Sequence, residues 1–168
     1  MRKLLVLLVV TVLGLAGCFA RTPALPEPPE PNDDENQAVA APDFELQDLD
    51  GGVWRLRDLR GDVVILYFWH GNCPTCVAKL PDLAGLEQRL PEDVHLLLLN
   101  GGDSREKVEK LLADYPNLTV LLDSEQAFRA YAITHVPTTV FVDRAGNVYR
   151  GYIGPLPNDY ILSIVNGL

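Results

Sequence analysis

The sequence is poor in cysteine and in positive charge. Its 168 residues contain three cysteines, too few for a framework of several disulfides. Lysine and arginine total 14 against 23 aspartate and glutamate residues, so the formal net charge is −9. Because an acidic surface repels phosphate backbones and anionic headgroups, we expect no nucleic-acid partner and no attachment to a membrane through a basic patch.

Long apolar runs are also missing, apart from one near the start. Arg2 and Lys3 precede an apolar run of about a dozen residues, whereas a membrane-spanning helix needs roughly 20, so we expect a signal peptide over residues 1–17. The run ends in Leu15-Ala16-Gly17-Cys18, which resembles the lipobox of bacterial lipoproteins. The alternative is an ordinary secretory signal with a stray cysteine. The resemblance implies a lipid on Cys18 that anchors an extracytoplasmic protein to a bacterial membrane, on the periplasmic side or on the outer face of the cell membrane.

Residues 18–41 have the composition of a tether. Five prolines between positions 23 and 31 alternate with glutamates, and Asp33, Asp34 and Glu35 follow. The stretch has no apolar periodicity and repels itself electrostatically. We therefore expect the lipidated cysteine to be followed by a disordered segment, and the folded domain to cover residues 42–168.

The rest of the chain alternates between strand and helix patterns. Apolar residues over 44–46 and 53–56 flank Asp50-Gly51-Gly52, which predicts a hairpin. The unbroken apolar run over 62–68 predicts a strand buried on both faces. We then expect a helix (76–90), a strand (94–99), a helix (104–115), a strand (119–122), a helix (125–131), a strand pair (139–142 and 148–152) and a last helix (157–165). This order predicts an α/β fold with a central mixed sheet flanked by helices.

Two cysteines remain after Cys18, and they are three positions apart. Because a bridge between Cys73 and Cys76 closes only a tiny loop, it stabilises little, which leaves redox chemistry or metal binding as its purpose. Structural zinc usually takes two such pairs, or one pair with two histidines. The three histidines show no ligand spacing relative to the pair, so we expect no metal.

The pair lies where the buried strand ends and a helix begins. Cys73 occupies the N-cap region, and Pro74 suits the first helical position because its missing N–H is not needed there. The positive end of the helix dipole stabilises a thiolate at Cys73, and the thiolate is the attacking species in disulfide exchange. We therefore expect Cys73 to be the nucleophile and Cys76, one turn deeper, to resolve the mixed disulfide, with no further cofactor.

The sequence around the pair resembles the active-site strand and helix of thioredoxins. Trp69 falls where thioredoxins carry a tryptophan beside the site, and Pro81 matches their helix-kinking proline. Thr134-His135-Val136-Pro137-Thr138 resembles the cis-proline loop. The resemblance implies that Pro137 is cis and that the backbone of Val136 pairs with the incoming chain. It also implies site-shaping roles for Trp69, Pro74, Thr75, Lys79 and Pro137.

Two further features narrow the resemblance. The expected N-terminal hairpin is similar to that of membrane-anchored thioredoxin-like proteins and of peroxiredoxins of the AhpC/TSA type. The extra helix and strand over 104–122 resemble the insertion of the TlpA and ResA type, and the Pro-Thr dipeptide between the cysteines is similar to that of the reductases of cytochrome c maturation. The resemblance implies a thioredoxin fold. It also implies that the protein reduces disulfides of exported proteins with electrons from a membrane thiol carrier.

Three residues depart from the pattern of these relatives. Tyr67 replaces the buried aspartate of thioredoxins, and Lys79 replaces the glutamate of the cytochrome-maturation relatives, which weakens an apocytochrome assignment. We expect Lys79 at a solvated helix position; an inward side chain would instead stabilise thiolate and raise the reduction potential. Asn72 also replaces the usual aromatic or small residue.

Alternative functions follow from the same residues. The hairpin would also fit a thiol peroxidase with Cys76 as its nucleophile. Such an enzyme requires threonine or serine three residues before the nucleophile, and this position holds Cys73. A copper-binding module would require a wider cysteine spacing. Within thiol chemistry, the sequence leaves open whether the protein reduces exported disulfides or oxidises exported thiols.

Overall fold

The computed structural model describes residues 38–168. The expected signal peptide, Cys18 and nearly all of the expected tether lie outside the described residues. Within 38–168, the structure contains no helix with the length and apolar character needed to cross a membrane.

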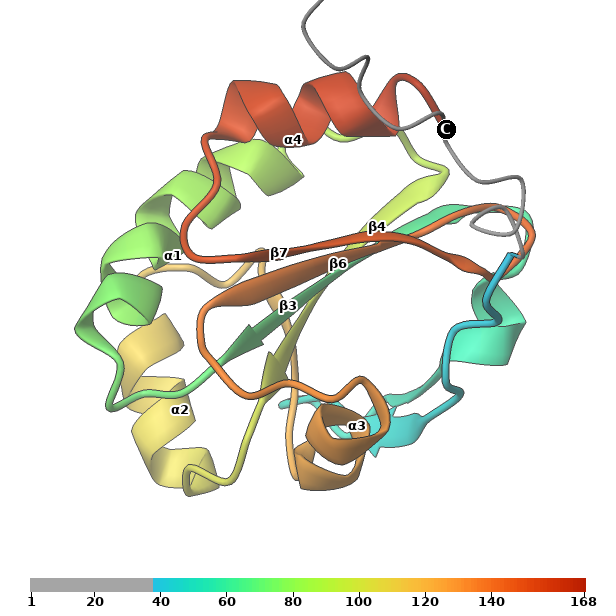
Figure 1. Ribbon diagram of the computed structural model, residues 1–168. Coiled ribbons are helices and arrows are strands. Elements are labelled where there is room, and N and C mark those ends of the chain that lie inside the picture. Colours follow the sequence, from blue (N-terminus) through green and yellow to red (C-terminus); the bar gives the residue numbers. More distant parts are fainter. Residues whose placement is uncertain (1–37) are drawn as a thin grey trace, which may run out of the picture. The chain divides into compact units, whose positions relative to one another are not determined.

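A five-stranded mixed sheet forms the centre of the fold, with the strand order β5-β4-β3-β6-β7 (Figure 1). The central strand β3 pairs in parallel with β4 and antiparallel with β6, as a mixed sheet requires. At the two edges, β5 pairs in parallel with β4, and β7 pairs antiparallel with β6. The strands are β3 (Val63–Trp69), β4 (Val94–Asn100), β5 (Thr119–Leu121), β6 (Thr138–Val142) and β7 (Val148–Ile153).

The position of β3 follows from its composition. All seven of its residues are buried, and successive side chains point to opposite faces of the sheet. One set joins a core that includes Cys76, and the other joins a second core that includes Phe44. The two sets are Val63, Ile65, Tyr67 and Trp69, and Val64, Leu66 and Phe68. Both faces of the sheet must therefore be covered.

Helices supply this cover on both faces (Figure 1). Buried side chains of α1 (Pro74–Glu87), α2 (Arg105–Leu112) and α4 (Asn158–Val165) join the core that contains Cys76. Helix α3 (Glu125–Ala130) contributes Ala127 to the other core. The helices therefore lie on the two sides of the sheet, as the alternation of patterns in the sequence predicts.

The expected hairpin forms a separate two-stranded sheet of β1 (Glu45–Gln47) and β2 (Val53–Arg55). Asp48 orders its turn, because one carboxylate oxygen accepts the Asp50 and Gly52 N–H groups and the other accepts the indole N–H of Trp54. The second strand ends one residue earlier than predicted. A 3₁₀ helix, η2 (Leu56–Leu59), follows it, and Leu56 is buried in the core on the α3 side.

The folded domain includes residues before the expected boundary at residue 42. The Ala41 N–H donates to the Gly146 carbonyl at 2.9 Å, and the Val148 N–H donates to the Val39 carbonyl at 2.8 Å. Ala40 also forms a bridge with Asn147. Residues 39–41 therefore lie along the start of β7, at the turn between β6 and β7, and are not part of a free tether.

Candidate functional site

Cys73 and Cys76 lie just beyond the carboxyl end of β3 and are joined by a disulfide, with their Cα atoms 5.2 Å apart. Cys73 is the N-cap of α1 in extended conformation, and its Sγ accepts the Cys76 N–H at 3.2 Å. Pro74 is the first residue of the helix. The sulfurs thus lie at the positive end of a 14-residue helix, an environment that favours a thiolate when the bond is reduced.

The two sulfurs differ in their access to solvent. Cys73 is half-buried, whereas Cys76 is 0% exposed and belongs to the core beneath α1. A partner molecule can therefore reach only Cys73 without rearranging the domain.

The loop before β6 faces the accessible sulfur. The Val136–Pro137 peptide bond is cis, as the resemblance predicts, and the Val136 carbonyl oxygen lies 3.8 Å from Cys73 Sγ. The Thr138 hydroxyl donates to the His135 carbonyl at 2.7 Å, and the Gly154 N–H donates to the Pro137 carbonyl at 2.7 Å. These bonds hold the backbone of Val136 beside Cys73.

A groove of about 390 Å³ lies next to Cys73. Gly101 and Gly102 form part of its lining, and a Cβ atom on Gly101 would clash with the imidazole of His70. The glycine therefore allows His70 to lie against this loop. The lining residues are His70, Asn72, Cys73, Gly101, Gly102, Asp103 and Val136.

The sequence profile of the AhpC/TSA family matches residues 38–150, which is most of the described domain. The chain belongs to the AhpC/TSA family. It is 35% identical over 137 residues to the thiol–disulfide oxidoreductase ResA of Geobacillus thermodenitrificans, covering 76% of this chain and 77% of the relative. With ResA of Bacillus subtilis it shares 30% identity over 129 residues, covering 75% and 72% of the two chains.

A solved structure supports the same assignment. The exposed lipoprotein thioredoxin Etrx1 of Streptococcus pneumoniae superposes with a TM-score of 0.69 and 31% identity, covering 76% of this chain and all of that one. The AhpC/TSA-family chain is therefore a thiol–disulfide oxidoreductase with the thioredoxin fold.

Two aromatic side chains of β3 pack behind the sulfurs of this AhpC/TSA-family domain. Tyr67 is buried and its hydroxyl donates to the Cys76 carbonyl at 3.4 Å. Burial raises the pKa of Tyr67, so its phenol stays protonated at neutral pH and can donate the hydrogen bond to the Cys76 carbonyl. Trp69 is fully buried, and its indole N–H has no hydrogen-bond partner within residues 38–168. Trp69 thus contributes packing, while Thr75 is exposed on the first turn of α1.

The expectation that Lys79 is solvated is wrong. Its side chain is 8% exposed, and its ammonium donates to Asp82 Oδ2 at 2.9 Å and to Asn158 Oδ1 at 3.0 Å. Asn158 in turn donates to the Asp82 carbonyl. Lys79 therefore joins α1 to the start of α4, and both of its described partners lie in these two helices rather than at the sulfurs.

A polar network beside the groove was not predicted from the sequence. Asp103 accepts hydrogen bonds from the Gly71 N–H, from Asn100 Nδ2 at 3.0 Å and from the ammonium of Lys107. The same ammonium donates to Asn72 Oδ1 at 2.7 Å. The only sequence signal was polar residues directly after a buried strand, at 100 and 103, and no pattern connected them with Asn72.

Because of Asp103, the free energy of unfolding should depend on pH in the acid range. Burial opposes its ionisation, but hydrogen bonds from Lys107, the Gly71 N–H and Asn100 outweigh burial, and its pKa lies below the ordinary value of 3.8. A lowered pKa contributes stability that is present above the ordinary value and is lost as pH falls through the folded value. We expect Asp103→Asn to lower the free energy of unfolding by about 1–2 kcal/mol at neutral pH.

Urea unfolding of the wild type and of Asp103→Asn at two pH values checks this prediction. The difference between the two proteins should shrink when the pH is well below 3.8, because the wild-type carboxyl is then protonated in both states. A difference that stays constant with pH would show that the charge of Asp103 does not stabilise the fold.

The histidines and cysteines are not arranged as a metal site. Within residues 38–168, no group of three or more histidine, cysteine, aspartate or glutamate side chains could hold a metal ion. His95 pairs with Asp62 at 2.8 Å, and the ring of His70 packs on Phe128 with 5.1 Å between centroids.

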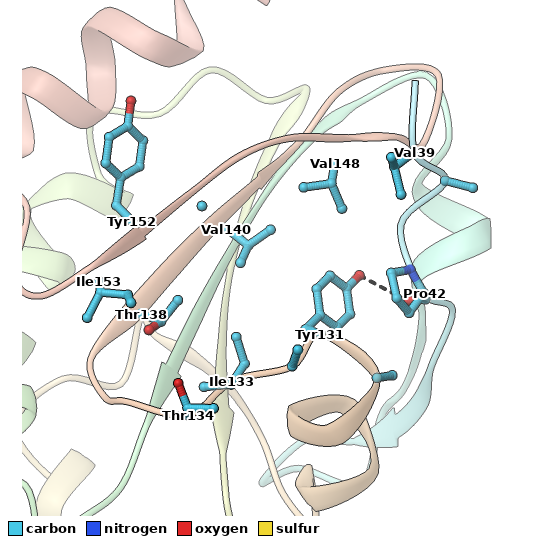
Figure 2. Close-up of a pocket in the computed structure, with 14 residues that line it drawn as sticks. Val39, Pro42, Tyr131, Ile133, Thr134, Thr138, Val140, Val148, Tyr152 and Ile153 are labelled. Atoms are coloured by element: carbon cyan, nitrogen blue, oxygen red, sulfur yellow. Dashed lines mark hydrogen bonds between the residues drawn. The ribbon is translucent and has the colours of Figure 1, made fainter. Parts of the chain in front are cut away.

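A second, larger hollow of about 550 Å³ has Thr134 and Thr138, which flank the cis-proline, in its lining (Figure 2). Its lining is mostly apolar and comes from β6, β7, the segment after α3 and the first of the described residues. Tyr131 points across it and donates to the Pro42 carbonyl at 2.9 Å (Figure 2). Neither cysteine lines this hollow, so it is separate from the exchange site.

Proposed function

We propose that the protein is a membrane-tethered, extracytoplasmic reductant of protein disulfides, with Cys73 as the attacking sulfur and Cys76 as the resolving sulfur. The observation that carries the proposal is the unequal access of the two sulfurs. Cys73 is half-buried at the N-terminus of α1 beside the Val136 carbonyl, whereas Cys76 is 0% exposed.

The reaction transfers two electrons from the pair to the substrate. The Cys73 thiolate attacks one sulfur of the substrate disulfide, forming a mixed disulfide and releasing the other sulfur as a thiolate that takes a proton. Cys76 then loses its proton and attacks Cys73 Sγ, which releases the second substrate thiolate. The chain is left with the Cys73–Cys76 disulfide, and a membrane thiol carrier of the dithiol class reduces it again.

The cis-proline loop supports binding of an extended polypeptide. The backbone of Val136 lies next to Cys73, and the bonds to Pro137 and Thr138 fix the loop in place. A substrate strand that pairs with Val136 would bring its cystine against Cys73 Sγ. The side chains of Trp69, Pro74 and Thr75 shape the site around the pair.

The tether and the location rest on the first residues of the chain. Leu15-Ala16-Gly17-Cys18 resembles a lipobox, and the name of the Streptococcus pneumoniae relative describes an exposed lipoprotein. Mass spectrometry of protein isolated from membranes should find the acyl groups on Cys18. Release of Cys18→Ala protein from the membrane fraction would support the same anchor.

The reducing direction rests on the resemblance of the Pro-Thr dipeptide to that of the reductases of cytochrome c maturation, but an apocytochrome substrate is not favoured. Tyr67 and Lys79 occupy the two positions at which an acid could assist proton transfer at Cys76. Since the Tyr67 phenol stays protonated and the Lys79 ammonium pairs with Asp82, neither side chain replaces the carboxylate that would accept the Cys76 proton. We therefore propose exported protein disulfides in general as substrates. Cytochrome c maturation is the narrower possibility within this class.

The reduction potential of the pair tests the proposal. Equilibration of the purified, detergent-solubilised protein with glutathione or dithiothreitol should give a value near or below roughly −230 mV, in the range of reducing thioredoxin-like couples. A value near about −120 mV would make the protein an oxidant of exported thiols instead. Rapid turnover of hydrogen peroxide would support the peroxidase alternative.

A further inference from the structure

The side chain of Asn72 has one defined orientation. The ammonium of Lys107 lies 2.7 Å from Asn72 Oδ1. Because an ammonium has donors only, it must face the amide oxygen, and the Asn72 NH₂ group must point away from Lys107. Asn72 therefore offers two N–H donors on the side opposite to Lys107.

Lys107 is itself held in place. It pairs with Asp103, whose side chain is 8% exposed and also accepts the Gly71 N–H and the side-chain amide of Asn100. A Cβ atom on Gly71 would lie 2.8 Å from Lys107 Cε, so glycine at this position allows the lysine to approach the backbone. The network thus fixes Lys107 against the turn that leads to Cys73.

Asn72 borders the groove in which a substrate must bind. Asn72, Cys73 and Val136 all line the hollow of about 390 Å³, and Asn72 is exposed. A polypeptide that reaches Cys73 beside Val136 therefore passes the NH₂ group of Asn72. Each residue of an extended polypeptide carries a backbone carbonyl that needs a donor.

We propose that Asn72 Nδ2 donates a hydrogen bond to a backbone carbonyl of the substrate next to its cystine, and that Lys107 is the positioning residue for this amide. The inference rests on the proposed function and narrows its substrates to polypeptide disulfides. A small disulfide without peptide bonds has no carbonyl to offer. The contact therefore favours exchange with proteins over exchange with small disulfides.

Exchange kinetics with two probes test the inference. The reduced, detergent-solubilised protein is mixed with insulin or with bis(2-hydroxyethyl) disulfide, and the two second-order rate constants are compared. Asn72→Leu is neutral and removes the donor, while Asn72→Asp keeps a partner for Lys107 and also lacks the donor. Both variants should lower the insulin rate relative to the small-disulfide rate about 3- to 10-fold, the effect of one lost hydrogen bond.

Variants of Lys107 separate positioning from packing. Lys107→Met should lower the ratio of the insulin rate to the small-disulfide rate, whereas Lys107→Arg should keep the wild-type ratio. The double variant Lys107→Met with Asn72→Leu should have the same ratio as Asn72→Leu alone. Lys110→Met, an exposed lysine of the same helix, is the matched control and should leave the ratio unchanged. Thermal unfolding of each variant confirms that the fold is kept.

Two results would overturn the inference. Asn72→Leu could change the rates of both probes by the same factor, which would mean that Asn72 acts on Cys73 and not on the substrate chain. The insulin rate could also be unaffected by Lys107→Met, which would remove the positioning role. If the wild-type protein reduced neither probe, the proposed function itself would fail, a result distinct from both.

Discussion

Cys76→Ser is expected to halt exchange after its first step, with Cys73 held in a mixed disulfide to the substrate. Cys73 remains accessible at the N-terminus of α1, so the attack on a substrate disulfide proceeds. The resolving sulfur is missing, and no other cysteine lies within residues 38–168. Non-reducing electrophoresis and mass spectrometry after mixing with insulin should show nearly stoichiometric covalent complex.

Cys73→Ser is the matched variant and should form no complex at all. A serine hydroxyl is protonated at neutral pH, and the remaining Cys76 is 0% exposed. The rate of attack on insulin should fall by at least about three orders of magnitude. Complex formation by Cys73→Ser, through Cys76, would reverse the roles assigned to the two sulfurs.

Phe141→Ala should lower the free energy of unfolding by about 3–5 kcal/mol. Phe141 is 0% exposed in β6, pairs with Ile65 of β3 and packs edge-on against Tyr152 with 6.0 Å between ring centroids. Removing the ring leaves a cavity in the core that the sheet shares with α1 and α4, and a strand cannot move inward to fill it. Urea unfolding monitored by circular dichroism measures the loss.

Phe141→Leu is the control, because it keeps most of the apolar side chain, leaves a smaller cavity and should lower the free energy of unfolding less than Phe141→Ala does. The exchange rate per folded molecule should be unchanged in both variants, since Phe141 is not part of the groove beside Cys73. A loss of less than about 1 kcal/mol for Phe141→Ala would mean that the sheet relaxes around the vacant space.

The fold was predictable because its signals are local. Seven consecutive apolar residues can form a strand only where both faces are covered, and β3 (Val63–Trp69) matches the expected 62–68 within one residue. Ser104 caps α2 by accepting the Lys107 N–H, so this helix begins within one residue of the predicted position 104. The 3₁₀ helix at Leu56–Leu59 was not predicted, because an apolar residue at the end of a strand pattern also fits a continuing strand.

The environment of the site was less predictable because it depends on contacts between distant residues. A lysine in a helix is normally expected to be exposed. Lys79 is enclosed only because Asn158, 79 residues later, docks against it. Asn72 and Lys107 are 35 residues apart, and their contact follows from the parallel pairing of β3 and β4. The sequence indicated the reactive pair, but not the network that orients its neighbour.

The route by which the chain enters the domain has a consequence for orientation. Residues 39–41 pair beside the turn between β6 and β7, and because β6 is antiparallel to β3, this turn lies at the end of the sheet remote from Cys73. The seven residues of β3 separate the two ends by about 20 Å. The chain therefore enters the domain at the end of the sheet opposite to the reactive sulfurs. If the protein is anchored as proposed, the segment that leads to the anchor joins the domain away from Cys73, and a substrate or an electron donor reaches the sulfurs without passing residues 39–41.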